Sequence, residues 1–379
     1  MNFVVDSKNP FLADALRPYG DTRELATPLI SQETLRHADA VVVRSETRVN
    51  AALLDGTAVR FIGTATIGTD HVDLEYLRER GIGFASAPGS NADSVAEYVA
   101  AALLEAAARR RIQLAGTTLG VVGVGNVGSR VVRVGRALGM HVLQNDPPRA
   151  RATGDPVFVS LDALMQADVI SVHVPLTPAG PDRTRHLFDR DRLSRMKPGA
   201  MLINSSRGAV VETQALLHAL SQRHLGGAIL DVWEGEPDIS TSLLAQVLIG
   251  TPHIAGYSFD GKVNAARMMF EAIARHFALP ARWISREDMP APHTGCITFT
   301  GGEELQSALL QAVRQCYDIS TDDVRLRTLL ALPPAARPGE FRLQRSTYPV
   351  RREFRATRIE GAASTAGLHE ALASLGFLA

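Results

Sequence analysis

Hydrophobic and polar positions along the chain alternate in blocks that predict short strands separated by helices. A strand is expected at residues 1–6, and further buried strands at 41–43, 59–63 and 83–85. Residues 73–80 have the pattern of a helix, and Gly81 directly after them is a typical helix end. The first ninety residues therefore indicate alternating strands and helices.

A long alanine-rich segment, 93–111, predicts one helix between two strand-rich regions. Ser94 and Glu97 have the spacing of a capping box near its start. The pattern of strand and helix then repeats several times, which favours right-handed βαβ units and a parallel, doubly wound sheet. Strands are expected at 119–124, 142–145, 169–174, 201–204 and 228–232, and helices at 127–138, 161–166, 189–196 and 212–222.

The last third of the chain changes character. A helix is expected at about 258–277, packed back onto the first region. Prolines that interrupt regular structure begin near residue 290. Two amphipathic helices are predicted near 303–316 and 322–330, and a basic strand near 349–357.

Composition narrows the class of protein. The chain has 379 residues, of which 45% are hydrophobic, enough for two or three globular domains. Lys+Arg and Asp+Glu both number 40, so no overall charge favours nucleic acid or an anionic membrane as a partner. The two cysteines lack metal-ligand spacing, and no metal site is expected. Without a signal peptide or a long apolar run, we expect a cytoplasmic protein.

A glycine-rich motif predicts a dinucleotide site. The segment Gly123–Gly128 reads GVGNVG and lies between a predicted strand and a predicted helix. In this context Gly123 permits a tight turn, Gly125 permits close approach of a pyrophosphate, and Gly128 permits close packing of helix and strand. Asn126 and Val127 begin the helix whose free N–H groups face the phosphates.

An acidic residue follows this motif at the expected distance. Asp146 ends the next predicted strand, about 20 residues on, where a carboxylate binds the adenosine ribose hydroxyls. Its charge would repel a 2′-phosphate, so the sequence favours NAD as cofactor. Arg149 and Arg151 lie close by and leave NADP as an alternative.

Three chemically suited residues follow the ends of later predicted strands: Arg207, Glu236 and His253. The carboxyl ends of parallel strands are where open α/β sheets bind ligands. Oxidation of a 2-hydroxy acid needs a base for the hydroxyl proton, and histidine suits this role. A carboxylate can orient the imidazole, and a guanidinium can hold the substrate carboxylate. The set predicts hydride transfer between a 2-hydroxy acid and NAD.

These motifs resemble those of the D-isomer-specific 2-hydroxyacid dehydrogenases. The matching segments are 123–128, 204–208, 231–237 and 251–256, and the likeness covers about residues 1–285. The resemblance implies an α/β fold with two Rossmann-like doubly wound parallel-sheet domains, followed here by a smaller α+β C-terminal domain. The implied division is 1–92 with 256–285 for substrate, 93–255 for NAD, and 286–379 for dimerisation.

Segments 43–50 and 61–71, with the extra C-terminal segment, resemble a narrower group of that family. Its members oxidise 4-phospho-D-erythronate with NAD to 2-oxo-3-hydroxy-4-phosphobutanoate in pyridoxal 5′-phosphate (vitamin B6) biosynthesis, and form homodimers through the C-terminal domain. The resemblance implies substrate contacts by Ser45, Thr66 and Tyr257. It implies a nicotinamide side formed by Ser205, Ser206, Arg207, Asp231 and Gly256, near Val174, where the family often has threonine.

A phosphorylated acid needs cations at both of its ends. Arg207 suits the carboxylate, and Arg44 and Arg48 are candidates for the phosphate. Arg345 and Arg351 suggest a further hypothesis, in which the C-terminal segment of one subunit reaches the partner's cleft. Two alternatives to this substrate stay open. One is a related dehydrogenase acting on 3-phosphoglycerate or hydroxypyruvate, and the other is a non-catalytic NAD-sensing protein resembling a corepressor.

Overall fold

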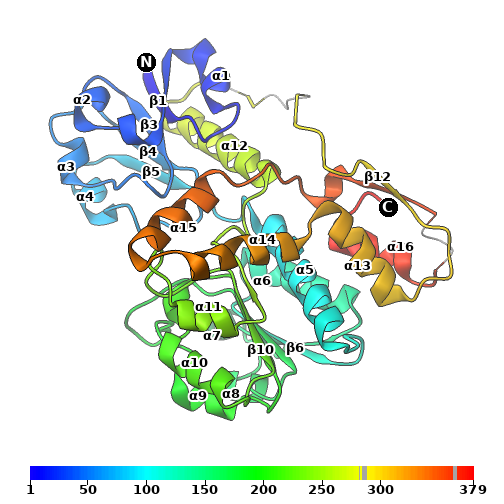
Figure 1. The fold of residues 1–379 in the computed structure, drawn as a ribbon. Coiled ribbons are helices and arrows are strands. Elements are labelled where there is room, and N and C mark those ends of the chain that lie inside the picture. The colour runs from blue at the N-terminus through cyan, green and yellow to red at the C-terminus, as the bar shows by residue number, and fades with distance from the viewer. Residues whose placement is uncertain (281, 284–287, 362–364) are drawn as a thin grey trace. The chain divides into compact units, whose positions relative to one another are not determined.

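The computed structural model describes residues 1–280, 282–283, 288–361 and 365–379, and these form two compact units. Unit 1 comprises Met1–Asn91 and Ser258–Pro290, and unit 2 comprises Ala92–Tyr257 and Ala291–Ala379. Each unit contains its own parallel sheet (Figure 1). Across the described ranges, no helix is long and apolar enough to cross a membrane.

Unit 1 is built on a five-stranded parallel sheet in the order β2-β1-β3-β4-β5. The predicted strands at 1–6, 41–43, 59–63 and 83–85 are confirmed. The edge strand β2 was not predicted because its sequence, DTREL, is mostly polar and exposed. The strands are β1 (Asn2–Asp6), β2 (Asp21–Leu25), β3 (Ala40–Val43), β4 (Phe61–Thr64) and β5 (Gly83–Ser86).

One long helix, α12 (Phe259–His276), closes the core of unit 1. The Ser258 side chain begins it by accepting a hydrogen bond from the Gly261 N–H at 2.8 Å. Its buried face packs Met269 and Phe270 against apolar side chains of the sheet. The shorter helices are α1 (Leu12–Leu16), α2 (Gln32–Leu35), α3 (Ala51–Leu54) and α4 (Leu74–Glu79), with 3₁₀ turns η1 (Arg17–Tyr19) and η2 (Thr27–Leu29).

Unit 2 contains a six-stranded parallel sheet in the order β11-β10-β9-β8-β6-β7. The chain changes direction across the sheet between β6 and β8, and such a switch point is where doubly wound sheets bind ligands. All five strands predicted in this region are present, and the two-residue β11 adds a sixth. They are β6 (Thr118–Val122), β7 (His141–Asn145), β8 (Val169–Val172), β9 (Met201–Asn204), β10 (Gly227–Leu230) and β11 (Ile249–Gly250). Both parallel sheets agree with the predicted α/β class.

The alanine-rich helix α5 (Ala92–Arg110) is buried along most of its length and packs against α6 (Asn126–Ala137). The predicted capping box at its start is wrong. Ser94 and Glu97 lie inside the helix, and both are hydrogen-bonded to C-terminal residues far along the chain. The other helices beside this sheet are α7 (Pro147–Thr153), α8 (Leu161–Leu164), α9 (Arg190–Arg195), α10 (Thr213–Ser221) and α11 (Thr241–Gln246), with a 3₁₀ turn η3 (Gly208–Val210).

Residues 291–379 belong to the same compact unit as the six-stranded sheet. They include a small parallel pair, β12 (Cys296–Thr298) with β13 (Arg358–Glu360). The predicted helices near 303–316 and 322–330 are present as α13 (Leu305–Cys316) and α14 (Ile319–Arg327), and α13 packs on α5 (Figure 1). The remaining elements are α15 (Arg337–Ser346), α16 (Leu368–Leu375), and the 3₁₀ turns η4 (Thr328–Ala331), η5 (Pro334–Ala336) and η6 (Phe354–Ala356).

The strand predicted near 349–357 is wrong. Residues 349–353 have no regular structure, and η6 follows them. The charged side chains that suggested an exposed strand face inward instead: Arg351 and Glu353 are buried. The backbone N–H of Phe354 is satisfied by the Glu97 carboxylate at 2.7 Å, and not by a neighbouring strand.

Candidate functional site

The glycine loop between β6 and α6 has the open geometry that a dinucleotide requires. Gly123 has φ +84°, and a Cβ there would lie 2.7 Å from the His173 carbonyl oxygen. A Cβ on Gly125 would meet no atom within 4 Å, so the backbone is accessible at this point. A Cβ on Gly128 would lie 1.9 Å from the Gly123 carbonyl oxygen, which requires glycine. The residues of the loop therefore fit a bound pyrophosphate.

Asp146 lies at the end of β7, as expected, and is bonded to the glycine loop. Its carboxylate accepts the Val124 N–H at 2.9 Å and, as N-cap of α7, the Arg149 N–H at 3.1 Å. The Arg149 guanidinium donates to the Val124 carbonyl oxygen and lies over the Phe158 ring. Arg151 forms an ion pair with Asp182 at 2.5 Å. Both arginines therefore have protein partners, while Asp146 presents its negative charge beside the loop.

Glu236 and His253 form a close pair. The Glu236 Oε1 lies 2.6 Å from the His253 Nδ1, so the carboxylate orients the ring and leaves Nε2 as the other ring nitrogen. Burial by itself would raise the Glu236 pKa, but His253 and Arg345 together hold that pKa below its ordinary value. Glu236 is thus an ionised carboxylate that can stabilise an imidazolium.

Asp231 fixes the backbone that presents His253. Its buried carboxylate accepts hydrogen bonds from the N–H groups of Ile254 at 2.7 Å and Ala255 at 2.9 Å, and from the Thr251 hydroxyl at 2.7 Å. Burial raises the Asp231 pKa, against the opposing effects of His253 and these donors. His253 itself has φ +58°, a conformation uncommon for a residue with a side chain. The loop is therefore held in one strained arrangement at the candidate base.

Arg207 follows the end of β9, one strand away from the loop that contains Glu236. The Asn204 side chain organises this turn, since it accepts from the Ser206 N–H at 3.1 Å and donates to the Arg207 carbonyl oxygen at 2.9 Å. Gly208 lets the turn after β9 pack directly on the backbone of Trp233, because a Cβ at this position would lie 2.0 Å from the Trp233 carbonyl carbon. The structure thus brings the loops of Arg207 and Glu236 into contact.

His173, which directly precedes Val174, has a defined place beside the predicted cofactor residues. It follows β8, and its Nε2 lies 2.8 Å from the Ser171 hydroxyl while its Nδ1 lies 3.5 Å from the Ser205 hydroxyl. Burial lowers the His173 pKa to about 3, so its imidazole is neutral near pH 7. Val174, Ser206 and Gly256 lie in the loops that follow β8, β9 and β11.

The expected substrate residues of unit 1 lie in the loops that follow β3 and β4. Arg44 donates to the Ala65 carbonyl oxygen at 3.3 Å, and the Ser45 and Arg48 side chains are exposed. The Thr66 hydroxyl lies 2.8 Å from that of Thr64 and donates to the Gly68 carbonyl oxygen at 2.9 Å. These loops form the carboxyl edge of the unit 1 sheet.

Lys262 is a functional candidate that the sequence did not single out. It lies in the first turn of α12, and burial together with the charges of Arg44 and Lys8 lowers its pKa to about 8. The two neighbouring cations disfavour the charged form of Lys262, and such a cluster of basic side chains is typical of a site that binds an anion. No local motif marks it, because Lys8, Arg44 and Lys262 come from three distant segments.

Tyr257 and Arg345 meet in unit 2. The Arg345 Nη2 donates to the Tyr257 hydroxyl at 3.3 Å, and the guanidinium lies 5.8 Å from the centre of the Tyr257 ring. Arg345 belongs to α15, and it contacts Tyr257 of its own chain. This contact lies within one chain, and the approach of the C-terminal segment to a partner's cleft stays a prediction.

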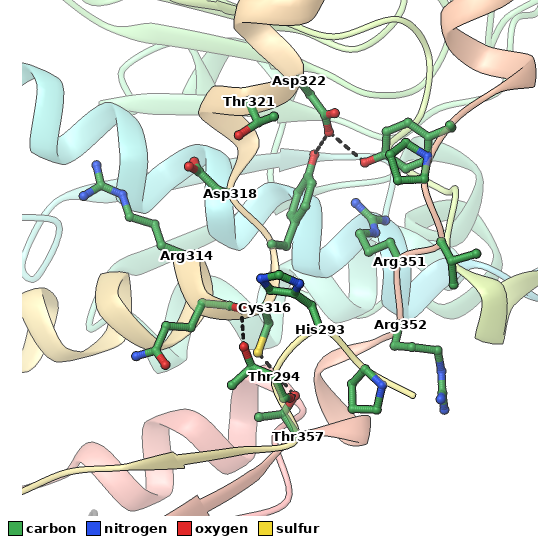
Figure 2. Close-up of a pocket in the computed structure, with 16 residues that line it drawn as sticks. His293, Thr294, Arg314, Cys316, Asp318, Thr321, Asp322, Arg351, Arg352 and Thr357 are labelled. Atoms are coloured by element: carbon green, nitrogen blue, oxygen red, sulfur yellow. Dashed lines mark hydrogen bonds between the residues drawn. The ribbon is translucent and has the colours of Figure 1, made fainter. Parts of the chain in front are cut away.

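Arg351, the other arginine of that hypothesis, is bonded to backbone groups of the protein itself. Its Nη2 donates to the carbonyl oxygens of Ala255 at 2.6 Å and Ser94 at 3.3 Å, and its guanidinium lies 4.3 Å from the centre of the Tyr317 ring. The residue lines a cavity of about 280 Å³ among C-terminal residues, where Arg351 and Arg352 point in different directions (Figure 2). Arg351 therefore links the C-terminal segment to α5 and to the loop after His253.

Comparisons with known proteins identify the class first. Residues 91–255 match the model of the D-isomer specific 2-hydroxyacid dehydrogenase NAD binding domain, and residues 289–376 match a domain of unknown function, DUF3410. D-lactate dehydrogenase from Aquifex aeolicus, solved with NAD and lactic acid, is 28% identical with a TM-score of 0.60, and covers 74% of this chain and 96% of its own. The chain is an NAD-dependent 2-hydroxyacid dehydrogenase.

Full-length relatives then identify the family. Erythronate-4-phosphate dehydrogenase of Chromohalobacter salexigens is 44% identical over 100% of this chain and 98% of its own. The Azotobacter vinelandii enzyme of that name is also 44% identical, over 99% of both chains. The chain belongs to the erythronate-4-phosphate dehydrogenase family.

Proposed function

We propose that the protein oxidises 4-phospho-D-erythronate with NAD to 2-oxo-3-hydroxy-4-phosphobutanoate and NADH, as a step of pyridoxal 5′-phosphate biosynthesis. The observation that carries the proposal is the pair formed by Glu236 and His253, 2.6 Å apart, in loops at the carboxyl edge of the NAD-binding sheet. The names of the full-length relatives support this choice of substrate.

In the proposed reaction His253 accepts the proton of the substrate's C2 hydroxyl while NAD, when bound, accepts the hydride from C2. Glu236 stabilises the resulting imidazolium, and Arg207 binds the substrate carboxylate in a bidentate pair. Ser45, Thr66, Tyr257 and Arg44 are the proposed further substrate contacts. The proposed NAD contacts are Gly123, Gly125, Asn126, Val127, Gly128, Asp146, Val174, Ser205, Ser206, Arg207, Asp231 and Gly256.

The domain roles and the assembly belong to the same proposal. Residues 1–92 and 256–285 bind substrate, 93–255 bind NAD, and 286–379 mediate homodimer formation in a cytoplasmic enzyme. Residues 289–376 match DUF3410, and the full-length relatives align across this segment as well. This supports a role of the segment that is specific to the family.

A single-turnover experiment tests the substrate. Purified protein and NAD are mixed with 4-phospho-D-erythronate or, separately, with 3-phosphoglycerate, and stoichiometric NADH absorbance is followed. A single turnover is chosen because slow NADH release would hide chemistry in a steady-state assay. We expect a burst with the four-carbon acid alone. A burst with 3-phosphoglycerate instead would assign another substrate to the same catalytic residues, and no burst with either would favour a non-catalytic NAD sensor.

A further inference from the structure

Arg345 places a cation beside the candidate catalytic pair. It lies in the last turn of α15, half-buried, with its Nη2 3.3 Å from the Tyr257 hydroxyl. Its charge is close enough to contribute to lowering the Glu236 pKa. Tyr257 follows His253 by four residues in the same loop. A residue of the C-terminal domain is therefore part of the surroundings of the proposed site, within one chain and one compact unit.

Two atoms at this place have unused hydrogen-bonding capacity. Within the part of the chain that the structure describes, the buried Arg345 Nε makes no hydrogen bond, and the buried Glu236 Oε2 makes none either. A buried polar atom without a partner is costly, and native proteins rarely leave one unless a ligand or water uses it. The Arg345 fork is thus only partly engaged by Tyr257, and it retains a donor for a further acceptor.

We propose that Arg345 binds the phosphate group of the substrate and makes the C-terminal domain a determinant of substrate specificity in its own chain. This inference rests on the proposed function. A guanidinium is suited to phosphate because its N–H groups match the phosphate oxygens in a bidentate geometry. Arg207 is already assigned to the carboxylate, and Arg345 adds a cation of unit 2 to Arg44 and Arg48, the candidates for the phosphate in unit 1.

Chain length supports the same assignment. The Aquifex aeolicus D-lactate dehydrogenase, whose crystals contain lactic acid, matches 74% of this chain over 96% of its own length. Lactic acid has a carboxylate but no phosphate. Arg345 lies in the segment 289–376, which matches a separate domain model. A group that recognises phosphate is expected in a part of the chain that is added to the common two-domain enzyme.

The other C-terminal arginines have different environments. Arg351 also has two buried donors without a partner among the described residues, Nε and Nη1, but it is only 6% exposed and its Nη2 is bonded to two backbone carbonyl oxygens, so its removal would disturb the fold. Arg342, three residues before Arg345 on α15, is exposed. Arg342 therefore offers a matched control with the same change of charge on the same helix.

The test compares Arg345→Gln, Arg345→Lys and the control Arg342→Gln in the full-length protein. Because slow NADH release would hide chemistry in the steady state, KM and kcat here denote the half-saturating concentration and the maximal rate of single-turnover NADH formation. They are measured with NAD and either 4-phospho-D-erythronate or D-erythronate, which lacks the phosphate. Inorganic phosphate is also titrated as a competitive inhibitor. We expect Arg345→Gln to raise KM for the phosphorylated acid by about 10- to 100-fold with kcat nearly unchanged, the range expected for a lost hydrogen bond to a charged group. Arg345→Lys should recover part of this loss.

The two substrates separate the proposal from a positioning role. If Arg345 acted only through Glu236, Arg345→Gln would lower kcat for both acids and move the pH–rate profile, and the proposal would be overturned. An unchanged KM, or the same change in Arg342→Gln, would overturn it as well. If the wild type oxidises 3-phosphoglycerate instead, the proposed function fails, but inhibition by inorganic phosphate still tests Arg345. Weaker inhibition in Arg345→Gln then supports phosphate binding, and unchanged inhibition contradicts it.

Discussion

His253 combines a strained backbone with a fixed side chain. Its φ of +58° is stabilised because Asp231 accepts the two N–H groups that follow it, while Glu236 holds its Nδ1. Strain of this kind persists only where the surrounding structure fixes it, and it is concentrated at functional sites. Glu236 occupies Nδ1 and fixes the ring, so Nε2 is left in one orientation to accept a proton, as a general base requires.

Replacement of His253 by alanine should therefore separate catalysis from cofactor binding. We expect kcat to fall by about two to four orders of magnitude, the usual contribution of a general base. NAD affinity, measured by fluorescence titration, should stay near the wild-type value because the glycine loop lies on other strands. A variant that keeps the wild-type kcat would remove His253 from the mechanism.

Lys262 predicts a specific dependence of stability on pH. Its pKa is about 8 in the folded protein, against an ordinary value of 10.5, because burial and two neighbouring cations disfavour the ammonium form. The cost of this half-buried charge is fully present below pH 8, and it declines as the pH rises from 8 to 10.5. Relative to Lys262→Met, the wild type should therefore gain stability across this window. Urea unfolding at pH 7, 9 and 10 measures the difference, and a constant difference would contradict the prediction.

At the scale of elements, strands and loops are predicted best where the apolar pattern or motif lies within one continuous segment. The strands of both sheets follow from local apolar runs, and the glycine loop and Asp146 follow from spacing within one βα unit. The contact of Arg345 with Tyr257 could not be predicted from the sequence, because the two residues are 88 positions apart and meet only through the packing of α15. Ser94 and Glu97 matched a capping box by spacing, yet both bond to residues more than 250 positions away.

Asp146 joins two elements, and its two roles can be separated by substitution. As N-cap it stabilises α7, and through Val124 it holds the glycine loop. Asp146→Asn keeps one acceptor for the cap but removes the charge and the second acceptor, which the Val124 N–H uses, so NADP should compete better with NAD while the cap of α7 is retained. Asp146→Ala should lose both, at a cost of about 1 kcal/mol in stability. The ratio of kcat/KM for NAD and NADP measures the first effect, and an unchanged ratio in both variants would exclude Asp146 from cofactor selection.

At the scale of the whole molecule, buried polar contacts tie the C-terminal segment to the rest of unit 2. The Ser94 hydroxyl donates to Glu353 at 2.8 Å, Glu97 accepts from the Phe354 N–H, and Arg351 donates to Ala255. Each contact joins residues beyond 350 either to α5 or to the loop after His253. The segment thus supports the backbone that presents the candidate base.

Loss of Arg351 should therefore destabilise the fold before it affects chemistry. Arg351→Met leaves the buried carboxylates near it without their cation, and removal of one partner from a buried charged network typically costs about 3–5 kcal/mol. We expect a clearly lower Tm, whereas the exposed Arg358→Gln should leave Tm nearly unchanged. Arg345 is the proposed phosphate ligand, whereas Arg351 is bonded through Nη2 to two backbone carbonyl oxygens, although its Nε and Nη1 also lack partners among the described residues. Phosphate should therefore raise the Tm of Arg351→Met but not that of Arg345→Gln. If phosphate protected both variants equally, the two arginines would not have the separate roles that their contacts indicate.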